Sequence, residues 1–150
     1  MDYLKKLRKK VGHMPLILPH ALIILFNKEG EILFEEREDD GFIDFPGGNI
    51  DFNESAEDAA VRELKEETGL IANKLEFFNL YSGPITRYKY FNGDEISGLD
   101  AVYICKDYSG VLKEDKKEVK KLFFSSINKV KGNLSPRNKQ ILEDLKGYKL

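Results

Sequence analysis

The segment from Gly48 to Leu70, GNIDFNESAEDAAVRELKEETGL, constrains the fold of this 150-residue chain more than any other. Ser55 followed by Asp58 resembles a capping box, and acidic side chains in the first turn stabilise a helix by their attraction to the positive end of its dipole. Gly69 offers the left-handed residue that commonly follows a helix. The segment therefore predicts a helix that begins near Ser55 and ends at about Glu67.

One face of this predicted helix carries a cluster of carboxylates. Glu63, Glu66 and Glu67 are three and four residues apart, so they share one side of the helix, whereas Val61 and Leu64 point toward a core. Like charges at this spacing repel by roughly a few tenths of a kcal/mol per pair unless cations neutralise them. Mg²⁺ prefers such hard oxygen ligands and takes further oxygens from a substrate phosphate. The pattern therefore predicts a site for a divalent metal ion.

Two further side chains flank the cluster. Glu54, at the turn before the helix, can approach the carboxylates from the side, and Arg62 can hold one of them in a bidentate fork. A solvated helix face would also explain a run of Glu, Lys and Arg, with Arg62 and Glu66 as an ordinary pair. That alternative does not explain the preceding Pro-Gly-Gly, the offset Glu54 and the terminal Gly69 together, so we favour the metal site.

The spacing of these residues resembles the complete signature of the Nudix hydrolases. Gly48, five residues, Glu54, seven residues and then RELKEETGL at residues 62–70 match every position of that signature. The Pro-Gly-Gly that precedes the signature in the family is also present, at residues 46–48. The resemblance implies an α/β (α+β) fold, namely the Nudix α/β/α sandwich with a mixed β-sheet.

The resemblance also implies which residues carry the chemistry. The implied metal ligands are the Gly47 carbonyl and the carboxylates of Glu63, Glu66 and Glu67. The implied catalytic set is Glu54, Arg62, Glu63, Glu66 and Glu67. Arg62 would orient carboxylates beside Glu54 rather than bind metal itself.

We therefore expect a Mg²⁺-dependent hydrolase, with Mn²⁺ as a substitute, in which water attacks a phosphoanhydride and a carboxylate accepts its proton. The implied substrate is a nucleoside diphosphate linked to another moiety, such as ADP-ribose, a nucleotide sugar or a nucleoside triphosphate. The general base is left open between a motif glutamate and Glu114, Asp115 or Glu118 on a later loop. The competing hypothesis is a non-catalytic Nudix-fold nucleotide-binding regulator, which the intact glutamate set disfavours.

The sequence gives less information about the nucleotide base. Many relatives carry Trp just before the Pro-Gly-Gly, where this chain has Ile43 followed by Asp44, which argues against base stacking there. In the family, a Pro or a Tyr at a fixed distance after the signature distinguishes some subfamilies. This chain has both, Pro84 fourteen residues and Tyr88 eighteen residues after Leu70, so they do not identify its subfamily. We expect weak discrimination between bases and a slight preference for a sugar-linked diphosphate.

Composition limits the kinds of binding partner and the cellular location that we expect for this protein. A formal net charge of -2 argues against a nucleic-acid polymer and leaves a small-molecule nucleotide. The apolar runs are shorter than the roughly 20 residues of a membrane span, and the start does not resemble a signal peptide. We expect a cytoplasmic protein without membrane contact, in which Cys105 is a buried strand thiol. Oligomeric state is left open, with a homodimer as one form.

The length fits a single Nudix hydrolase domain over residues 1–150. Periodicity predicts an N-terminal amphipathic helix at about residues 2–11 and a C-terminal helix at about residues 136–146. His13 and His20 are placed before the first strand, as structural or surface residues. Strands are predicted at residues 21–27, 32–37, 75–81, 99–105 and around Phe123, with an Asn92-Gly93 hairpin turn before the strand at 99–105.

Overall fold

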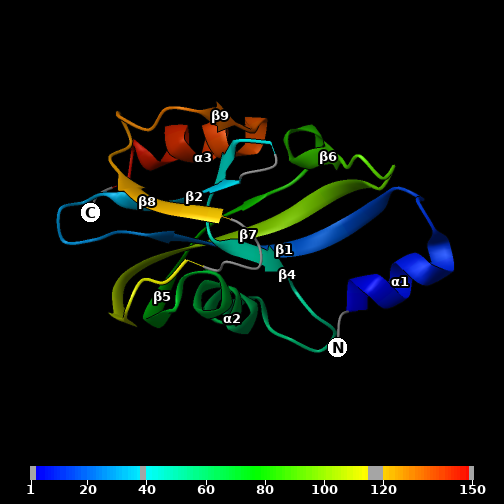
Figure 1. Cartoon of the computed structure of the whole chain (residues 1–150), viewed down its shortest axis with the longest axis horizontal. Coiled ribbons are helices and arrows are strands. Elements are labelled where there is room, and N and C mark those ends of the chain that lie inside the picture. The colour runs from blue at the N-terminus through cyan, green and yellow to red at the C-terminus, as the bar shows by residue number, and fades with distance from the viewer. Residues whose placement is uncertain (1–2, 38–39, 115–119, 149–150) are drawn as a thin grey trace.

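The computed structural model describes residues 3–37, 40–114 and 120–148. Helix α2 covers one side of the β structure and helix α3 the other, so the molecule has three layers (Figure 1). The helices are α1 (Tyr3–Val11), α2 (Ala56–Thr68), the 3-10 helix η1 (Pro84–Thr86) and α3 (Pro136–Leu145). The strands are β1 (Leu16–Leu25), β2 (Ile32–Arg37), β3 (Phe42–Asp44), β4 (Gly47–Asn49), β5 (Leu70–Tyr81), β6 (Arg87–Lys89), β7 (Glu95–Gly110), β8 (Lys120–Ser125) and β9 (Asn133–Leu134).

The strands form two mixed sheets. In the larger sheet the order is β4-β1-β7-β5, with β6 also paired to β7. Strand β1 runs parallel to β7, and the other pairs of this sheet are antiparallel. The smaller sheet has the order β8-β2-β3-β9, in which only β3 and β9 are parallel. The expected α/β/α sandwich with mixed strand pairing is confirmed.

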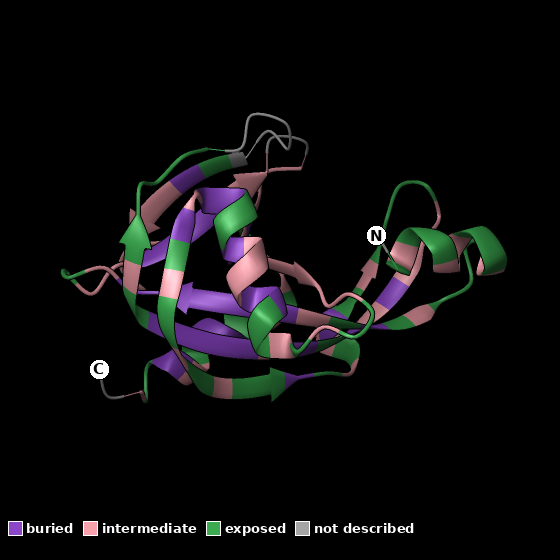
Figure 2. Cartoon of the chain, turned by 90° about the horizontal axis from the view of Figure 1, so that it is seen from below, coloured by how far each residue is buried: buried purple, intermediate pink, exposed green. Residues whose placement is uncertain are grey.

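Strand β1 is buried on both faces because it lies between the two helical layers. Leu22 and Ile24 belong to the core on the α3 side, and Ile23 and Leu25 belong to the core on the α2 side. All four are at most 4% exposed. The strand segments directly behind α2 are largely purple, that is buried, in Figure 2. The alternation of side chains along one strand therefore links the two cores.

Strands β1, β5 and β7 are longer than their sequence patterns predict. Strand β1 already begins at Leu16 and contains Pro19 and His20, so the placement of His20 before the first strand was wrong. Pro19 is tolerated in this strand; its carbonyl still accepts a hydrogen bond from Ile50 N at 3.1 Å. Strand β5 begins at Leu70 rather than at residue 75. Register shifts against β7 interrupt the alternation of apolar residues along β5, but they do not end its pairing with β7.

The Pro-Gly-Gly segment is not a simple turn. Its two glycines open strand β4, in which Leu22 pairs with Gly47 and His20 with Asn49. A side chain at Gly47 would collide with the Ala21 carbonyl, so only glycine permits this close pairing. The short strands β3, β4 and β9 had no usable sequence signal. Of these three strands, β4 matters most for the candidate site, because it runs beside α2.

The two terminal helices and the hairpin agree with the prediction. Helix α3 begins at Pro136 after the N-cap Ser135, and α1 lies at one end of the molecule (Figure 1). In the hairpin, Tyr90 N donates to the Asp94 carbonyl at 2.8 Å. Within the described residues, no helix has the length and apolar character needed to cross a membrane.

Candidate active site

Local interactions set the length of helix α2. Ser55 is the N-cap, and its Oγ atom accepts a hydrogen bond from Asp58 N at 3.0 Å. Gly69 ends the helix with φ 78°, and its N–H donates to the Lys65 carbonyl. Leu64 is fully buried against the sheet, as expected, whereas Val61 is only half-buried. The predicted helix is therefore confirmed at both ends.

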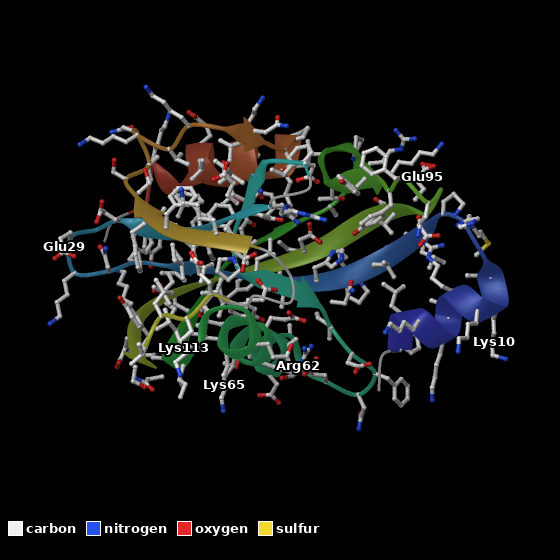
Figure 3. The ribbon with its side chains drawn as sticks, in the orientation of Figure 1. Lys10, Glu29, Arg62, Lys65, Glu95 and Lys113 are labelled. Carbon is white, nitrogen blue, oxygen red and sulfur yellow. The ribbon has the colours of Figure 1, made fainter. Side chains whose placement is uncertain are left out.

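Arg62 is the centre of the site and projects from α2 (Figure 3). Its Nε and Nη2 atoms donate to the two carboxylate oxygens of Glu54 at 2.7 and 2.9 Å, which is the expected fork. Its Nη1 atom donates to Glu63 at 3.0 Å and to Glu66 at 3.3 Å. Its Nη2 atom also donates to the Asn49 carbonyl at 3.1 Å. One guanidinium thus joins α2, strand β4 and the loop before α2.

These contacts shift the acidity of both members of the fork. The hydrogen bonds from Arg62 lower the pKa of Glu54 below its ordinary value, and a backbone hydrogen bond from Asp51 N adds to this effect. The hydrogen bond to Glu54 in turn raises the pKa of Arg62, with Glu63 contributing. Arg62 is therefore a permanent cation beside the carboxylate cluster, in a supporting position.

The three metal-ligand candidates differ in environment. Glu63 lies against strand β4: a Cβ atom on Gly48 would be only 2.6 Å from its carboxyl carbon. Glu66 is exposed, with 59% of its side chain accessible, whereas Glu67 is 6% exposed. Glycine at position 48 is therefore needed to leave room for the Glu63 carboxylate.

The carboxylates fit a hard divalent cation in chemistry, although they are not gathered around one point. Among the described residues, no three His, Cys, Asp or Glu side chains lie close enough to form a ready metal site. Glu63 and Glu66 instead each turn an oxygen toward the Nη1 atom of Arg62. The Glu66 bond is the longest that Arg62 makes and is exposed, so little opposes a turn of Glu66 toward a cation.

The loop candidates for a general base are placed differently. A Glu114 oxygen accepts a hydrogen bond from Leu122 N at 3.5 Å, and the neighbouring Lys113 N donates to the Thr68 carbonyl at 2.8 Å. This segment therefore passes the end of α2. Asp115 and Glu118 lie outside the described residues. Among the described candidates, the structure places the motif glutamates Glu54, Glu63 and Glu66 beside Arg62.

A pocket of about 230 Å³ lies on one side of β4, and we call it the aromatic pocket. The rings of Tyr88 and Tyr90 meet edge to face with centroids 4.7 Å apart, and Phe42 packs against Tyr88 at 6.3 Å. Ile43 also lines the pocket but is 2% exposed, within the core. The rest of the lining includes Phe45, Gly47, Gly48, Asn49, Ile85, Arg87 and Ile96.

Charged side chains from distant parts of the chain meet in the wall of this pocket. Arg137 of α3 donates to Asp100 at 2.9 Å and to Asp44 at 2.8 Å. His20 Nδ1 lies 2.7 Å from the other Asp100 oxygen, and Asn138 donates to Asp44 at 3.0 Å. The aspartates raise the pKa of Arg137 against the opposing effect of its burial. This set was missed because its members are far apart in sequence, although the strand register places His20 opposite Asp100.

A second pocket of about 380 Å³ lies on the α1 side of β4, and we call it the helix pocket. Arg62, Glu63 and Glu66 contribute one wall. The remaining lining consists of Tyr3, Leu4, Leu18, Pro19, Asn49, Ile50 and Asp51. Asn49 lines both pockets, so they adjoin at strand β4, next to the Glu63 carboxylate.

Cys105 and His13 lie outside this arrangement. Cys105 is fully buried, as predicted, and burial raises the pKa of its thiol to about 11. His13 is a surface residue whose Nδ1 atom lies 2.7 Å from Asp94. Neither residue lines the aromatic pocket or the helix pocket.

Solved structures resemble this arrangement in fold. A MutT NUDIX hydrolase from Burkholderia pseudomallei superposes with a TM-score of 0.72 at 20% identity, covering 86% of this chain and 98% of that one. A mutator MutT protein from Bacillus halodurans gives 0.71 at 18% identity, covering 87% and 83%.

Curated relatives match over shorter stretches. A putative 8-oxo-dGTP diphosphatase from Bacillus subtilis is 44% identical over 64 residues, which is 43% of each chain. An ADP-ribose pyrophosphatase from Methanocaldococcus jannaschii is 36% identical over 89 residues, which is 55% of this chain and 53% of that one. The matches thus span about half of these relatives or less.

The family model described as the NUDIX domain matches residues 17–145. This range contains α2, Arg62 with its carboxylate partners and the charged wall of the aromatic pocket. It begins after α1. Because the model covers most of the chain, the chain belongs to the Nudix family.

Proposed function

We propose that this protein is a Mg²⁺-dependent pyrophosphohydrolase, with Mn²⁺ as a substitute, that cleaves a nucleoside diphosphate linked to a second moiety. The observation that carries the proposal is the position of Glu63. Its carboxylate lies against Gly48, beside Arg62 and next to the junction of two pockets. A diphosphate laid there has room for one group in each pocket.

Glu63, Glu66 and Glu67 would hold the metal together with the Gly47 carbonyl. A bound Mg²⁺ would neutralise the diphosphate and lower the pKa of an attacking water. A motif glutamate accepts the proton as the water oxygen attacks phosphorus, and the bridging oxygen leaves with the other phosphate. Arg62 and Glu54 hold this helix face in position, through the fork already described.

The aromatic pocket is the proposed site of the nucleobase. Its tyrosine rings offer faces and edges for stacking, and its charged wall offers both donors and acceptors. These residues support a proposal of selective base recognition, which stands against the weak discrimination expected from the sequence, and the screen below decides between the two. Relatives with the names 8-oxo-dGTP diphosphatase and ADP-ribose pyrophosphatase represent two candidate substrate types.

A screen with product identification would test this function. The kcat/KM values for ADP-ribose, a nucleotide sugar, a dinucleoside polyphosphate, dGTP and 8-oxo-dGTP should be compared at one Mg²⁺ concentration. A preference of about a thousandfold for one base, worth about 4 kcal/mol, would identify a selective pocket. Activity should disappear reversibly in EDTA and return with Mg²⁺ or Mn²⁺.

The metal ligands are tested by Glu66→Gln and Glu67→Gln. Each change keeps the side-chain shape but removes an anionic ligand, so hydrolysis should fall by at least about a hundredfold. Thermal stability without metal should stay similar or rise, since like charges are removed from one helix face. Near-normal turnover of both variants would contradict the metal assignment, and nucleotide binding without turnover in the wild type would favour the regulator.

We also propose that residues 1–150 form a single domain, that the protein is cytoplasmic and that its substrate is a small nucleotide. The net charge of -2 supports a small nucleotide over a nucleic-acid polymer. Sedimentation of the purified chain would decide between a monomer and a homodimer.

A further inference from the structure

The helix pocket has a wall that the family model does not include. Helix α1 ends at Val11, before the matched range begins at residue 17. Tyr3 and Leu4 of α1 line the pocket together with Arg62, Glu63 and Glu66. We propose that the helix pocket binds the second moiety of the substrate, a neutral hydroxyl-bearing ring such as a sugar. This inference rests on the proposed function, because it places that group beyond the diphosphate.

Helix α1 is fixed to the body of the protein at both ends. At its start, Tyr3 N donates to Asp51 at 3.1 Å, and the Tyr3 ring stacks on Phe52 with centroids 6.2 Å apart. At its end, Arg8 donates to the Glu95 carbonyl at 3.2 Å. None of the α1 residues is buried, so these contacts rather than a core define its position. The wall is therefore a fixed part of the site.

The charges of the pocket favour a neutral group over another phosphate. Asp51, Glu63 and Glu66 supply three carboxylates, and Arg62 is the one Lys or Arg side chain in the lining. The donors of Arg62 are already shared among four acceptor groups. An anionic group away from the metal would lie beside the Asp51 carboxylate, which is not one of the proposed metal ligands, whereas a hydroxyl group can donate to it.

Asp51 has an acceptor to offer in the pocket. It uses one carboxylate oxygen for Tyr3 N and Phe52 N, and its other oxygen has no bond to the described residues. A ligand hydroxyl can donate to that oxygen.

The lining also has apolar side chains. Leu4, Leu18, Pro19 and Ile50 supply aliphatic surface. A lining that combines polar and aliphatic side chains suits a sugar ring, which has hydroxyl groups on its rim and C–H groups on its face. The moiety therefore differs in chemistry from the nucleobase proposed for the aromatic pocket.

The test compares a sugar-linked substrate with a triphosphate in variants of α1. Leu4→Trp fills the pocket, and Leu7→Trp makes the same change on the same helix outside the lining. The ratio of kcat/KM for ADP-ribose to that for ATP should fall by at least about tenfold in Leu4→Trp. In Leu7→Trp it should change by less than about twofold. Thermal unfolding of both variants checks that they are folded.

A second variant does not depend on filling the pocket. Asp51→Asn keeps an acceptor for Tyr3 N but loses the charge, so the same ratio should again fall. An unchanged ratio in both Leu4→Trp and Asp51→Asn, or equal losses for both substrates, would overturn the inference.

A binding arm separates this inference from the proposed function. If the wild type hydrolyses no nucleotide, the proposed function fails, and affinity with Ca²⁺ in place of Mg²⁺ then decides the pocket. ADP-ribose should bind more tightly than ADP, and Leu4→Trp should remove the difference. Equal wild-type affinities for ADP-ribose and ADP would refute the second subsite.

Discussion

Replacing Arg62 by Lys should lower turnover even when Mg²⁺ is saturating. Arg62 makes four hydrogen bonds to carboxylates and one to a backbone carbonyl, from three different nitrogen atoms. A lysine keeps the positive charge but presents its donors from a single nitrogen, so it cannot reproduce the fork on Glu54. The carboxylates of Glu63 and Glu66 would then lose a fixed partner.

The magnitude follows from the bonds that lysine cannot replace. Losing two charge-assisted bonds would cost about 3 kcal/mol if they were buried, but the Arg62 side chain is 34% exposed. With solvent screening, we expect about 1–2 kcal/mol. That corresponds to kcat lower by about 5- to 30-fold and to a Tm lower by about 2–8 °C in a domain of this size.

The assay is kcat at saturating substrate and saturating Mg²⁺, with thermal unfolding in EDTA as the stability measurement. Lys65→Arg is the matched control, because Lys65 is exposed on the same helix (Figure 3). Wild-type kcat and Tm in Arg62→Lys would refute the positioning role and leave Arg62 as a surface ion-pair partner.

Three further predictions concern Glu54, Cys105 and Tyr88. Because Arg62 lowers the folded-state pKa of Glu54 from 4.5, the unfolded state binds more protons below about that pH. The free energy of unfolding should therefore decrease as the pH falls from about 4.5 through the lowered pKa. In Glu54→Gln the urea midpoint should decrease less over the same pH range. Equal decreases in the wild type and in Glu54→Gln would contradict the linkage. Since burial raises the pKa of the Cys105 thiol to about 11, a maleimide at about pH 8 should label native protein far more slowly than unfolded protein. Tyr88→Leu should weaken nucleotide binding by about 0.5–1.5 kcal/mol if the base stacks there, and an unchanged Kd by titration calorimetry would place the base elsewhere.

The pairing of distant segments decided two features that no local pattern predicted. Gly47 and Gly48 belong to strand β4, because the glycines allow close pairing with β1. The charged wall of the aromatic pocket is the second: the structure brings Asp44 to Arg137 across 93 residues and His20 to Asp100 across 80 residues. Such pairs leave no periodic signal in either segment.

The sequence by itself determined helix α2 and its caps and predicted a fork from Arg62 to one carboxylate, because these depend on residues within about two helical turns of one another. Only the tertiary structure decided what surrounds that helix. Strand pairing set Gly48 against Glu63, and α1 closed one side of the helix pocket. Local spacing encodes hydrogen bonds along one helix, whereas the walls of a pocket depend on where separate strands and helices pack.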